Sequence, residues 1–277
     1  NGFYGRMNIG RRSPMGWPAA LPVMSVQAGT KSIRFMSKRV YLNGPIGVFD
    51  SGLGGLTVVK ALRQQMPQEP VVYFGDTARV HYGTKSRESI IRFSKENVVT
   101  LLKHKVKMIV VACNSSTSHA LTELQKTFDL PIIGVISPGV RKALQVTKNK
   151  RIGIIATPAT VNSGAYENQI LAGDRSVKVI SQPCPLFVPL VEEGWFDRPV
   201  TRMVAQEYLR KVKVFRIDTL ILGCTHYPLL KSVIAKVMGP KVALVDSAQE
   251  VAREVKEFLD QRRNGSRPQK ADPRYEF

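Results

Sequence analysis

The stretch LILGCTHYP, residues 220–228, combines the pattern of a buried strand with reactive side chains. An apolar run that ends at a glycine is typical of a buried strand, and helix-compatible residues follow from Leu229. Cys224 therefore lies where a strand gives way to a helix. In α/β folds, ligands bind at this carboxyl end of the strands. The stretch predicts an α/β fold with Cys224 at a ligand site.

The same pattern occurs earlier in the chain, in the stretch IVVACNSS at residues 109–116. An apolar run and a small residue again precede a cysteine, Cys113, and amide and hydroxyl side chains follow it. Two cysteines in matching contexts, about a domain apart, predict a pair that acts together. The third cysteine, Cys184, lies between two prolines, and we expect it to be structural.

Short apolar runs alternate with segments of helical periodicity from residue 46 onward. We expect strands at 46–49, 71–74, 108–112, 131–136, 151–156, 177–181, 219–222 and 242–245. We expect helices at 56–66, 86–104, 116–128, 140–146, 161–171, 199–213, 229–238 and 248–262. Such alternation is typical of parallel sheets covered by helices. Because this number of strands suits two sheets better than one, we predict two similar parallel-sheet α/β domains with the active site in the cleft between them.

Composition limits the class of protein and its surroundings. The 277 residues are 43% hydrophobic, as in ordinary globular proteins, and no apolar run approaches the ~18–20 residues that span a bilayer. Three cysteines are too few for a secreted disulfide framework, so we expect free thiols and a cytoplasmic location. Residues 1–45 have no helical or strand period, and we expect a disordered extension, with organellar import possible if it is a transit peptide.

The net charge of +20 allows more than one interpretation. Basic surfaces attract nucleic acids, anionic membranes or acidic small molecules. No nucleic-acid motif and no basic patch interleaved with aromatic residues accompanies the charge. We therefore expect a solvated basic surface, and a basic DNA-binding or partner-binding protein remains an alternative.

Cys113 and Cys224 both precede helices, where the helix N-terminus can lower the pKa of a thiol. Two thiols on opposite sides of one carbon can perform two-base chemistry, in which one removes a proton and the other delivers one. Alternatively, the two cysteines form a redox pair, or one is a nucleophile and the other takes no part in the chemistry. His226 is a candidate proton partner for Cys224. Asp50, at the end of the first strand, is either a functional carboxylate or a helix cap.

Neutral hydrogen-bond donors recur next to the predicted strand ends. The glycine-rich turn at residues 50–55 matches neither a dinucleotide fingerprint nor a phosphate loop, but its N–H groups could hold a carboxylate. Further donors lie at 82–86, 157–160 and beside the two cysteines. Such donors suit a small polar acid better than a nucleotide. Cys224 and His226 alone are a weak metal signal, so the sequence predicts no metal and no cofactor.

Four motifs in this order resemble the glutamate racemase family of the aspartate/glutamate racemase superfamily. They are FDSGLGG at 49–55, FGDTAR at 74–79 leading into YGTKS at 82–86, ACN at 112–114, and GCTHYP at 223–228. The resemblance extends from about residue 46 to 262. It implies cofactor-independent interconversion of L- and D-glutamate, which supplies D-glutamate for peptidoglycan. An aspartate racemase of the same superfamily, or a thiol oxidoreductase, remains an alternative.

The resemblance also implies roles for individual residues. Cys113 would act on the D-substrate with the assistance of Asp50, and Cys224 on the L-substrate with the assistance of His226. Glu192, in the stretch VPLVEEG at 188–194, resembles a further acidic residue of the family. Substrate contacts are expected at Asp50, Ser51, Tyr82, Gly83, Cys113, Asn114, Ser115, Thr160, Cys224, Thr225 and His226.

The family's organisation implies domain limits for this chain. A first domain would comprise 46–137 plus the helix at 247–263, a second 138–246, and 264–277 would be a flexible tail. We expect a homodimer that binds glutamate, no membrane association, and no main role in binding nucleic acid. Two residues depart from the family pattern: His81 replaces a usual proline, and Ser115 replaces a usual threonine.

Overall fold

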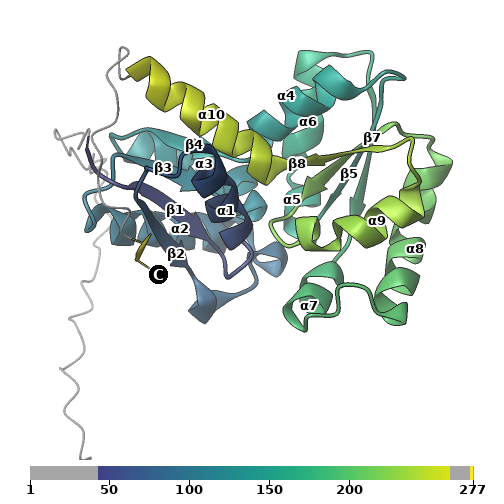
Figure 1. The fold of residues 1–277 in the computed structure, drawn as a ribbon, viewed down its shortest axis with the longest axis horizontal. Coiled ribbons are helices and arrows are strands. Elements are labelled where there is room, and N and C mark those ends of the chain that lie inside the picture. Colours follow the sequence, from purple (N-terminus) through teal and green to yellow (C-terminus); the bar gives the residue numbers. More distant parts are fainter. Residues whose placement is uncertain (1–42, 263–274, 277) are drawn as a thin grey trace, which may run out of the picture. The chain divides into compact units, whose positions relative to one another are not determined.

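The computed structural model describes residues 43–262 and 275–276. Within these residues, strands alternate with helices and form two parallel sheets (Figure 1). All eight predicted strands are present, as β1–β8, and the predicted α/β class is confirmed. The disordered extension predicted for residues 1–45 lies almost wholly outside the described residues.

The first sheet has the strand order β4-β3-β1-β2-β9. Its strands are β1 (Ile46–Asp50), β2 (Val71–Gly75), β3 (Met108–Val111), β4 (Ile132–Gly134) and β9 (Tyr275–Glu276). The helices between them are α1 (Leu56–Gln65), α2 (Arg87–Leu102) and α3 (Asn114–Thr127), with short 3₁₀ turns η1 (Thr77–Arg79) and η2 (Tyr82–Thr84). In the parallel register, Asp50 at the end of β1 lies beside Gly75 of β2.

The second sheet has the strand order β6-β5-β7-β8. Its strands are β5 (Arg151–Ala156), β6 (Lys178–Pro183), β7 (Thr219–Gly223) and β8 (Ala243–Asp246). Its helices are α4 (Ile136–Val146), α5 (Pro158–Asn162), α6 (Ala165–Gly173), α7 (Phe187–Glu192), α8 (Pro199–Val214) and α9 (Lys231–Met238), the last preceded by η3 (Tyr227–Leu230). β5 and β7 are central, so their carboxyl ends meet at one edge of the sheet.

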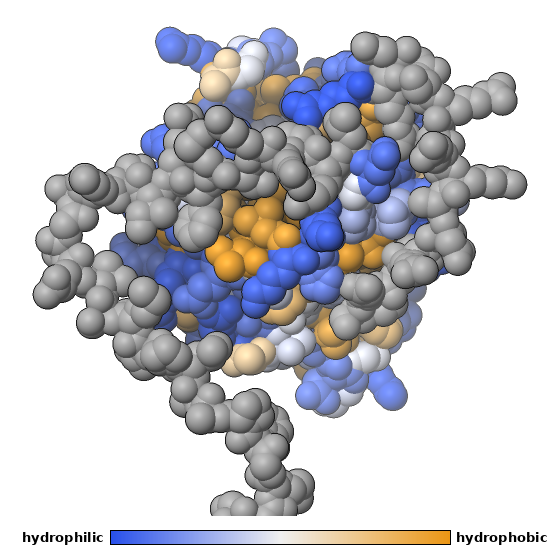
Figure 2. Space-filling model, turned by 90° about the vertical axis from the view of Figure 1, so that its left-hand side faces the viewer, coloured by the Kyte–Doolittle hydropathy of each residue, from blue (hydrophilic) through white to orange (hydrophobic). Residues whose placement is uncertain are grey.

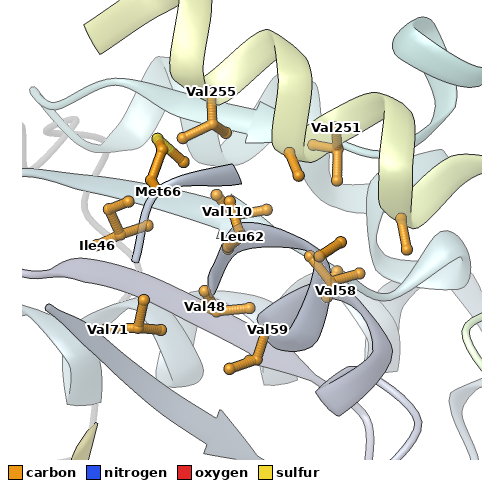
Figure 3. Packing of buried hydrophobic residues seen from close by; sticks show 14 of the residues in the cluster. Ile46, Val48, Val58, Val59, Leu62, Met66, Val71, Val110, Val251 and Val255 are labelled. Atoms are coloured by element: carbon orange, nitrogen blue, oxygen red, sulfur yellow. The ribbon is translucent and has the colours of Figure 1, made fainter. Parts of the chain in front are cut away.

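The last helix, α10 (Ser247–Arg262), follows the second sheet in sequence but packs on the first. Val251 and Val255 of α10 share a buried cluster with Leu62 of α1 and Val110 of β3 (Figure 3). Burial of each valine side chain contributes about 1.5–3 kcal/mol, which favours docking of the apolar side of α10 on α1. We call the first sheet with α1–α3 and α10 the first lobe, and the second sheet with α4–α9 the second lobe.

The sequence prediction was wrong at three places. The predicted strand at 131–136 ends at Gly134, and α4 begins at Ile136, earlier than the predicted 140. The predicted helix at 161–171 is two helices, because Gly164 adopts a left-handed conformation (φ +65°) that interrupts the helix. Helix α7 was not predicted, since its six residues contain Pro189 and are too short to display a helical period.

The predicted domain limits stay a prediction. The limit at 137/138 falls inside the first turn of α4, whose residues Ile136, Val140 and Ala143 pack with the second sheet. Of the tail predicted to be flexible, residues 275–276 form β9 and pair with β2, because the edge of β2 offers free backbone groups.

Figure 2 views the molecule from the side of the first lobe. Seen from that side, a group of hydrophobic side chains lies among hydrophilic ones (Figure 2). In the part of the chain that the structure describes, no helix combines the length and apolar character needed to cross a membrane.

Candidate active site

Cys113 and Cys224 end two central strands and line one pocket. Cys113 follows β3 and precedes α3, and Cys224 follows β7 and precedes η3. The pocket holds about 310 Å³ of space, part of it open to solvent. Its lining comes from both lobes: Ser51, His81, Gly83, Cys113, Asn114, Ser115, Thr157, Val188, Gly223, Cys224, Thr225 and His226. The two thiols therefore face the same small space, each from its own lobe.

Cys113 caps the N-terminus of α3. Its Sγ accepts a hydrogen bond from the Ser116 N–H at 3.4 Å and donates one to Ser51 Oγ at 3.7 Å. Burial raises the pKa of Cys113 to about 11, and the nearby Asp50 carboxylate acts in the same direction. The bonds from Ser116 and Ser51 oppose this increase only in part. The protein environment alone therefore keeps this thiol protonated at neutral pH.

The Asp50 carboxylate is fully buried behind Cys113. Its Oδ2 accepts hydrogen bonds from the N–H groups of Gly52 at 3.2 Å and Gly55 at 2.9 Å. Among the described residues, its Oδ1 has no hydrogen-bond partner. Burial raises the pKa of Asp50, while the charge of His226 and the turn N–H groups lower it. Asp50 thus caps the turn with Oδ2 and keeps Oδ1 without a partner among the described residues, and its functional role stays a prediction.

Cys224 and His226 form the corresponding pair on the other side. The distance from Cys224 Sγ to His226 Nδ1 is 3.8 Å, and Thr225 Oγ1 lies 3.5 Å from the same nitrogen. Burial raises the pKa of Cys224, against a hydrogen bond from the backbone of His226. The other imidazole nitrogen, Nε2, lies 3.1 Å from Glu192 Oε1 at the end of α7. The carboxylate therefore fixes the ring that reaches Cys224.

Hydroxyl groups from both lobes meet beside Cys113. Ser115 Oγ lies 3.0 Å from Thr157 Oγ1 and 3.2 Å from Thr160 Oγ1, and the two threonine oxygens are 3.2 Å apart. Asn114 Oδ1 accepts a bond from Tyr166 of the second lobe at 2.7 Å. The Asn114 amide nitrogen is buried and, within the described chain, has no hydrogen-bond acceptor. Since Asn114 lines the pocket, this nitrogen is available to an acceptor on a ligand.

Tyr82 and Gly83 belong to η2 and differ in their exposure to the pocket. Tyr82 is fully buried; its hydroxyl donates to Asp76 and accepts a bond from Asn97 Nδ2 at 3.1 Å. Its side chain supports η2 from behind and does not line the pocket. Gly83 does line it, and a Cβ there would lie 2.6 Å from Thr157 Cβ. Only a glycine lets η2 approach the second lobe this closely.

Most residues predicted from the sequence converge on this site. The pocket lining includes eight of them: Ser51, Gly83, Cys113, Asn114, Ser115, Cys224, Thr225 and His226. Of the other four, Thr160 and Glu192 contact the lining residues Ser115 and His226, and Asp50 and Tyr82 directly precede the lining residues Ser51 and Gly83 in sequence. Their individual roles stay predictions.

The site residues missed by sequence reasoning are Val188 and Gly223; Thr157 is among the donors expected at 157–160 but not among the expected substrate contacts. Thr157 and Val188 belong to the stretches 157–160 and 188–194. In those stretches the sequence analysis assigned a function only to Thr160 and Glu192. The sequence around Gly223 indicates only the end of a strand. The C-terminal ends of β5 and β7 are adjacent, with Ala156 paired to Gly223, so this pairing could have pointed to both Thr157 and Gly223.

The described residues contain no group of three or more His, Cys, Asp and Glu side chains placed to hold a metal. The arrangement offers two thiols, one from each lobe, in a pocket rich in neutral donors, with Asp50 near Cys113 and His226 near Cys224. Such a set can remove a proton from one face of a bound carbon and return one to the other.

Comparison with known proteins gives a consistent result. Residues 56–255 match the model of a family described as Asp/Glu/Hydantoin racemase. A glutamate racemase from Geobacter metallireducens is 51% identical over 214 residues, which cover 77% of this chain and 79% of that protein.

Solved structures agree with the fold. A glutamate racemase isoform from Bacillus anthracis superposes with a TM-score of 0.80 at 40% identity, covering 84% of this chain and 86% of that one. A glutamate racemase from Francisella tularensis in complex with D-glutamate gives a TM-score of 0.77 at 40% identity, covering 84% and 87%. The two-domain α/β architecture is thus shared with these proteins.

Proposed function

The chain belongs to the Asp/Glu/hydantoin racemase family and is an amino-acid racemase, and we propose that its reaction interconverts L- and D-glutamate through the two thiols Cys113 and Cys224. The relatives at about half identity are named glutamate racemases, which supports glutamate as the substrate. The observation that carries the mechanism is that both thiols line one pocket from opposite lobes.

The proposed step conserves protons without a cofactor. For L-glutamate, the Cys224 thiolate takes the α-proton, and the Cys113 thiol then delivers its own proton to the opposite face of the carbanion. Cys224 ends as a thiol and Cys113 as a thiolate. The D-to-L reaction runs through the same atoms in reverse order. Each thiol therefore acts once as base and once as acid in a full cycle.

The raised pKa values of both thiols explain why substrate must take part in forming the thiolate. Burial favours the neutral thiol, and the ammonium group of a bound amino acid would favour the thiolate by its positive charge. Asp50 beside Cys113, and His226 beside Cys224, are the groups placed to take up the released proton. The base thus forms when the substrate is present.

Neutral groups are proposed to hold the two carboxylates of glutamate. The Asn114 amide, whose nitrogen is buried without a protein acceptor in the described chain, is the first candidate donor. Hydroxyls of Ser51, Ser115 and Thr225 line the same pocket. Because these donors carry no charge, they can bind the carboxylates without imposing a charge state on the two thiols.

We further propose that the protein is cytoplasmic, since free thiols persist in a reducing compartment. We also propose that it forms a homodimer and supplies D-glutamate for peptidoglycan.

The test is incubation of the protein with L-glutamate in deuterated water without added cofactor. We expect optical rotation to decay toward zero while deuterium enters the α-position of glutamate. Cys113→Ala and Cys224→Ala should each lower kcat by a factor of about 10² or more. Cys184→Ala is the matched control, because this buried thiol is outside the pocket.

A parallel incubation with L-aspartate tests the alternative substrate. Racemisation of aspartate and not of glutamate would leave the two-thiol mechanism intact and contradict the substrate. Full activity in either cysteine variant would contradict the mechanism itself.

A further inference from the structure

The Glu192 carboxylate bridges two imidazole rings at the entrance of the pocket. Its Oε1 lies 3.1 Å from His226 Nε2, and its Oε2 lies 3.2 Å from His81 Nε2. The ring centroids of the two histidines are 6.5 Å apart and nearly perpendicular, at 74°. Each oxygen of one carboxylate is thus engaged by a different histidine.

The bridge joins the two lobes. His81 lies in the first lobe, between η1 and η2, while Glu192 ends α7 of the second lobe. The His81 and Glu192 side chains are 37% and 39% exposed, and that of His226 is 6% exposed. The connected side chains His81, Glu192 and His226 therefore lead from the solvent-exposed rim to the buried His226 ring, whose Nδ1 lies 3.8 Å from Cys224 Sγ.

We propose that His81 is a positioning residue for the Cys224 half-reaction, holding Glu192 so that the carboxylate keeps Nδ1 of His226 directed at the thiol. A carboxylate at the end of a helix, more than a third exposed, has several rotamers of similar energy. A hydrogen bond to His81 selects the rotamer in which Oε1 meets His226. The proline that usually replaces His81 in the resembling family has no side-chain donor, so this chain carries a restraint of its own.

We expect the loss of His81 to act mainly on one side of the reaction. The His81 imidazole contacts Glu192 and, through Glu192, is connected to His226 and Cys224. The contacts of Cys113 are instead with Ser51 and Ser116. The loss of His81 should therefore slow the proton transfer at Cys224 and leave that at Cys113 intact. This inference rests on the proposed two-thiol function.

The experiment compares His81→Phe, which keeps a ring without a donor, with His81→Gln, whose amide can donate to Glu192. The full chain is assayed with L- and D-glutamate, each with hydrogen or deuterium at the α-carbon. We expect His81→Phe to lower kcat/KM by roughly tenfold in both directions. Equal losses are required, because the equilibrium constant of a racemisation is one. His81→Gln should recover most of the activity.

The isotope effects distinguish positioning from general loosening. If transfer at Cys224 becomes slower, the deuterium isotope effect with L-glutamate increases, since Cys224 removes that label. The isotope effect with D-glutamate decreases, since Cys113 removes the label in a step that no longer limits the rate. Unchanged isotope effects, or equal changes in both directions, would overturn the inference.

Two further measurements complete the test. Glu192→Gln should reproduce the asymmetry of His81→Phe, whereas Glu193→Gln, its exposed neighbour, should not. Imidazole ¹⁵N spectra of the unmodified protein, with four histidines, and of His81→Phe, with three, should differ at His226 and agree at His119. An unshifted His226 overturns the inference independently of turnover. If the unmodified protein racemises neither glutamate nor aspartate, the two-thiol function is refuted, and the inference with it.

Discussion

Gly54 lies against His226 so closely that a Cβ on the glycine would be 2.5 Å from the Nδ1 atom of the histidine. The same Cβ would lie 2.5 Å from Thr225 Oγ1. Gly54 belongs to the first lobe and the other two residues to the second, so the glycine-rich turn is packed onto the imidazole that lies next to Cys224. The glycine at this position sets the distance between the two halves of the site.

Gly54→Ala should therefore reduce activity by displacing the ring of His226. Contacts under about 3 Å between a Cβ and a heavy atom require one of them to move, and movement of about 1 Å at a catalytic group can cost on the order of 10² in rate. The measurement is kcat/KM for glutamate together with thermal unfolding. Gly139→Ala is the control, because a Cβ there lies 3.6 Å from its nearest neighbour. Equal activity of the two variants would contradict the packing argument.

Ser115 should tolerate threonine but not alanine. Its hydroxyl forms hydrogen bonds with the hydroxyls of Thr157 and Thr160 in the other lobe. Ser115→Ala removes one hydrogen-bond partner from each of these two buried hydroxyls. The cost of about 1–3 kcal/mol should appear mainly as an increase in KM of roughly ten- to a hundredfold. Ser115→Thr keeps the oxygen and should retain KM within about threefold. Steady-state kinetics of both variants measure these KM values. An unchanged KM in Ser115→Ala would contradict the prediction.

Alkylation of Cys113 should report its raised pKa. Iodoacetamide reacts with the thiolate, and burial raises the pKa of Cys113 to about 11. Without substrate, the alkylation rate should therefore rise about tenfold per pH unit from pH 8 to about 10, instead of levelling near the ordinary value of about 8.5. Mass spectrometry of the peptide that contains Cys113 follows the rate, and Cys113→Ala verifies the peptide assignment. A plateau below pH 9 would show that this thiol is already activated in the free protein.

Strand-to-helix periodicity predicted the fold class without difficulty. Buried parallel strands such as β1, β3 and β7 are continuous apolar runs and were therefore visible in the sequence, and the edge strands β6 and β8 were predicted from shorter apolar segments. Boundaries were less predictable where the determining interaction lies far away in the chain. The helix expected at 161–171 divides at Gly164, and α7 is stabilised by packing of Phe187 and Leu190 in the core of the second lobe.

The chemistry of the site was also predictable in its main parts. Polar residues that follow apolar runs mark the carboxyl ends of strands, which identified Cys113, Cys224 and Asp50. Glu192 entered only through the resemblance, because nothing local distinguishes it from its neighbour Glu193. The ring of His226 selects Glu192 in space, and sequence spacing of 34 residues carries no sign of that contact.

The sequence by itself determined which residues can do chemistry and that they stand at strand ends, because hydrophobic periodicity and residue type are local properties. Only the tertiary structure decided that the two thiols share one pocket, that burial raises the pKa of each, and that Glu192 connects His81 to His226. These properties depend on distances between chain segments far apart in sequence and on the exclusion of water between them. Those quantities exist only after the lobes have packed.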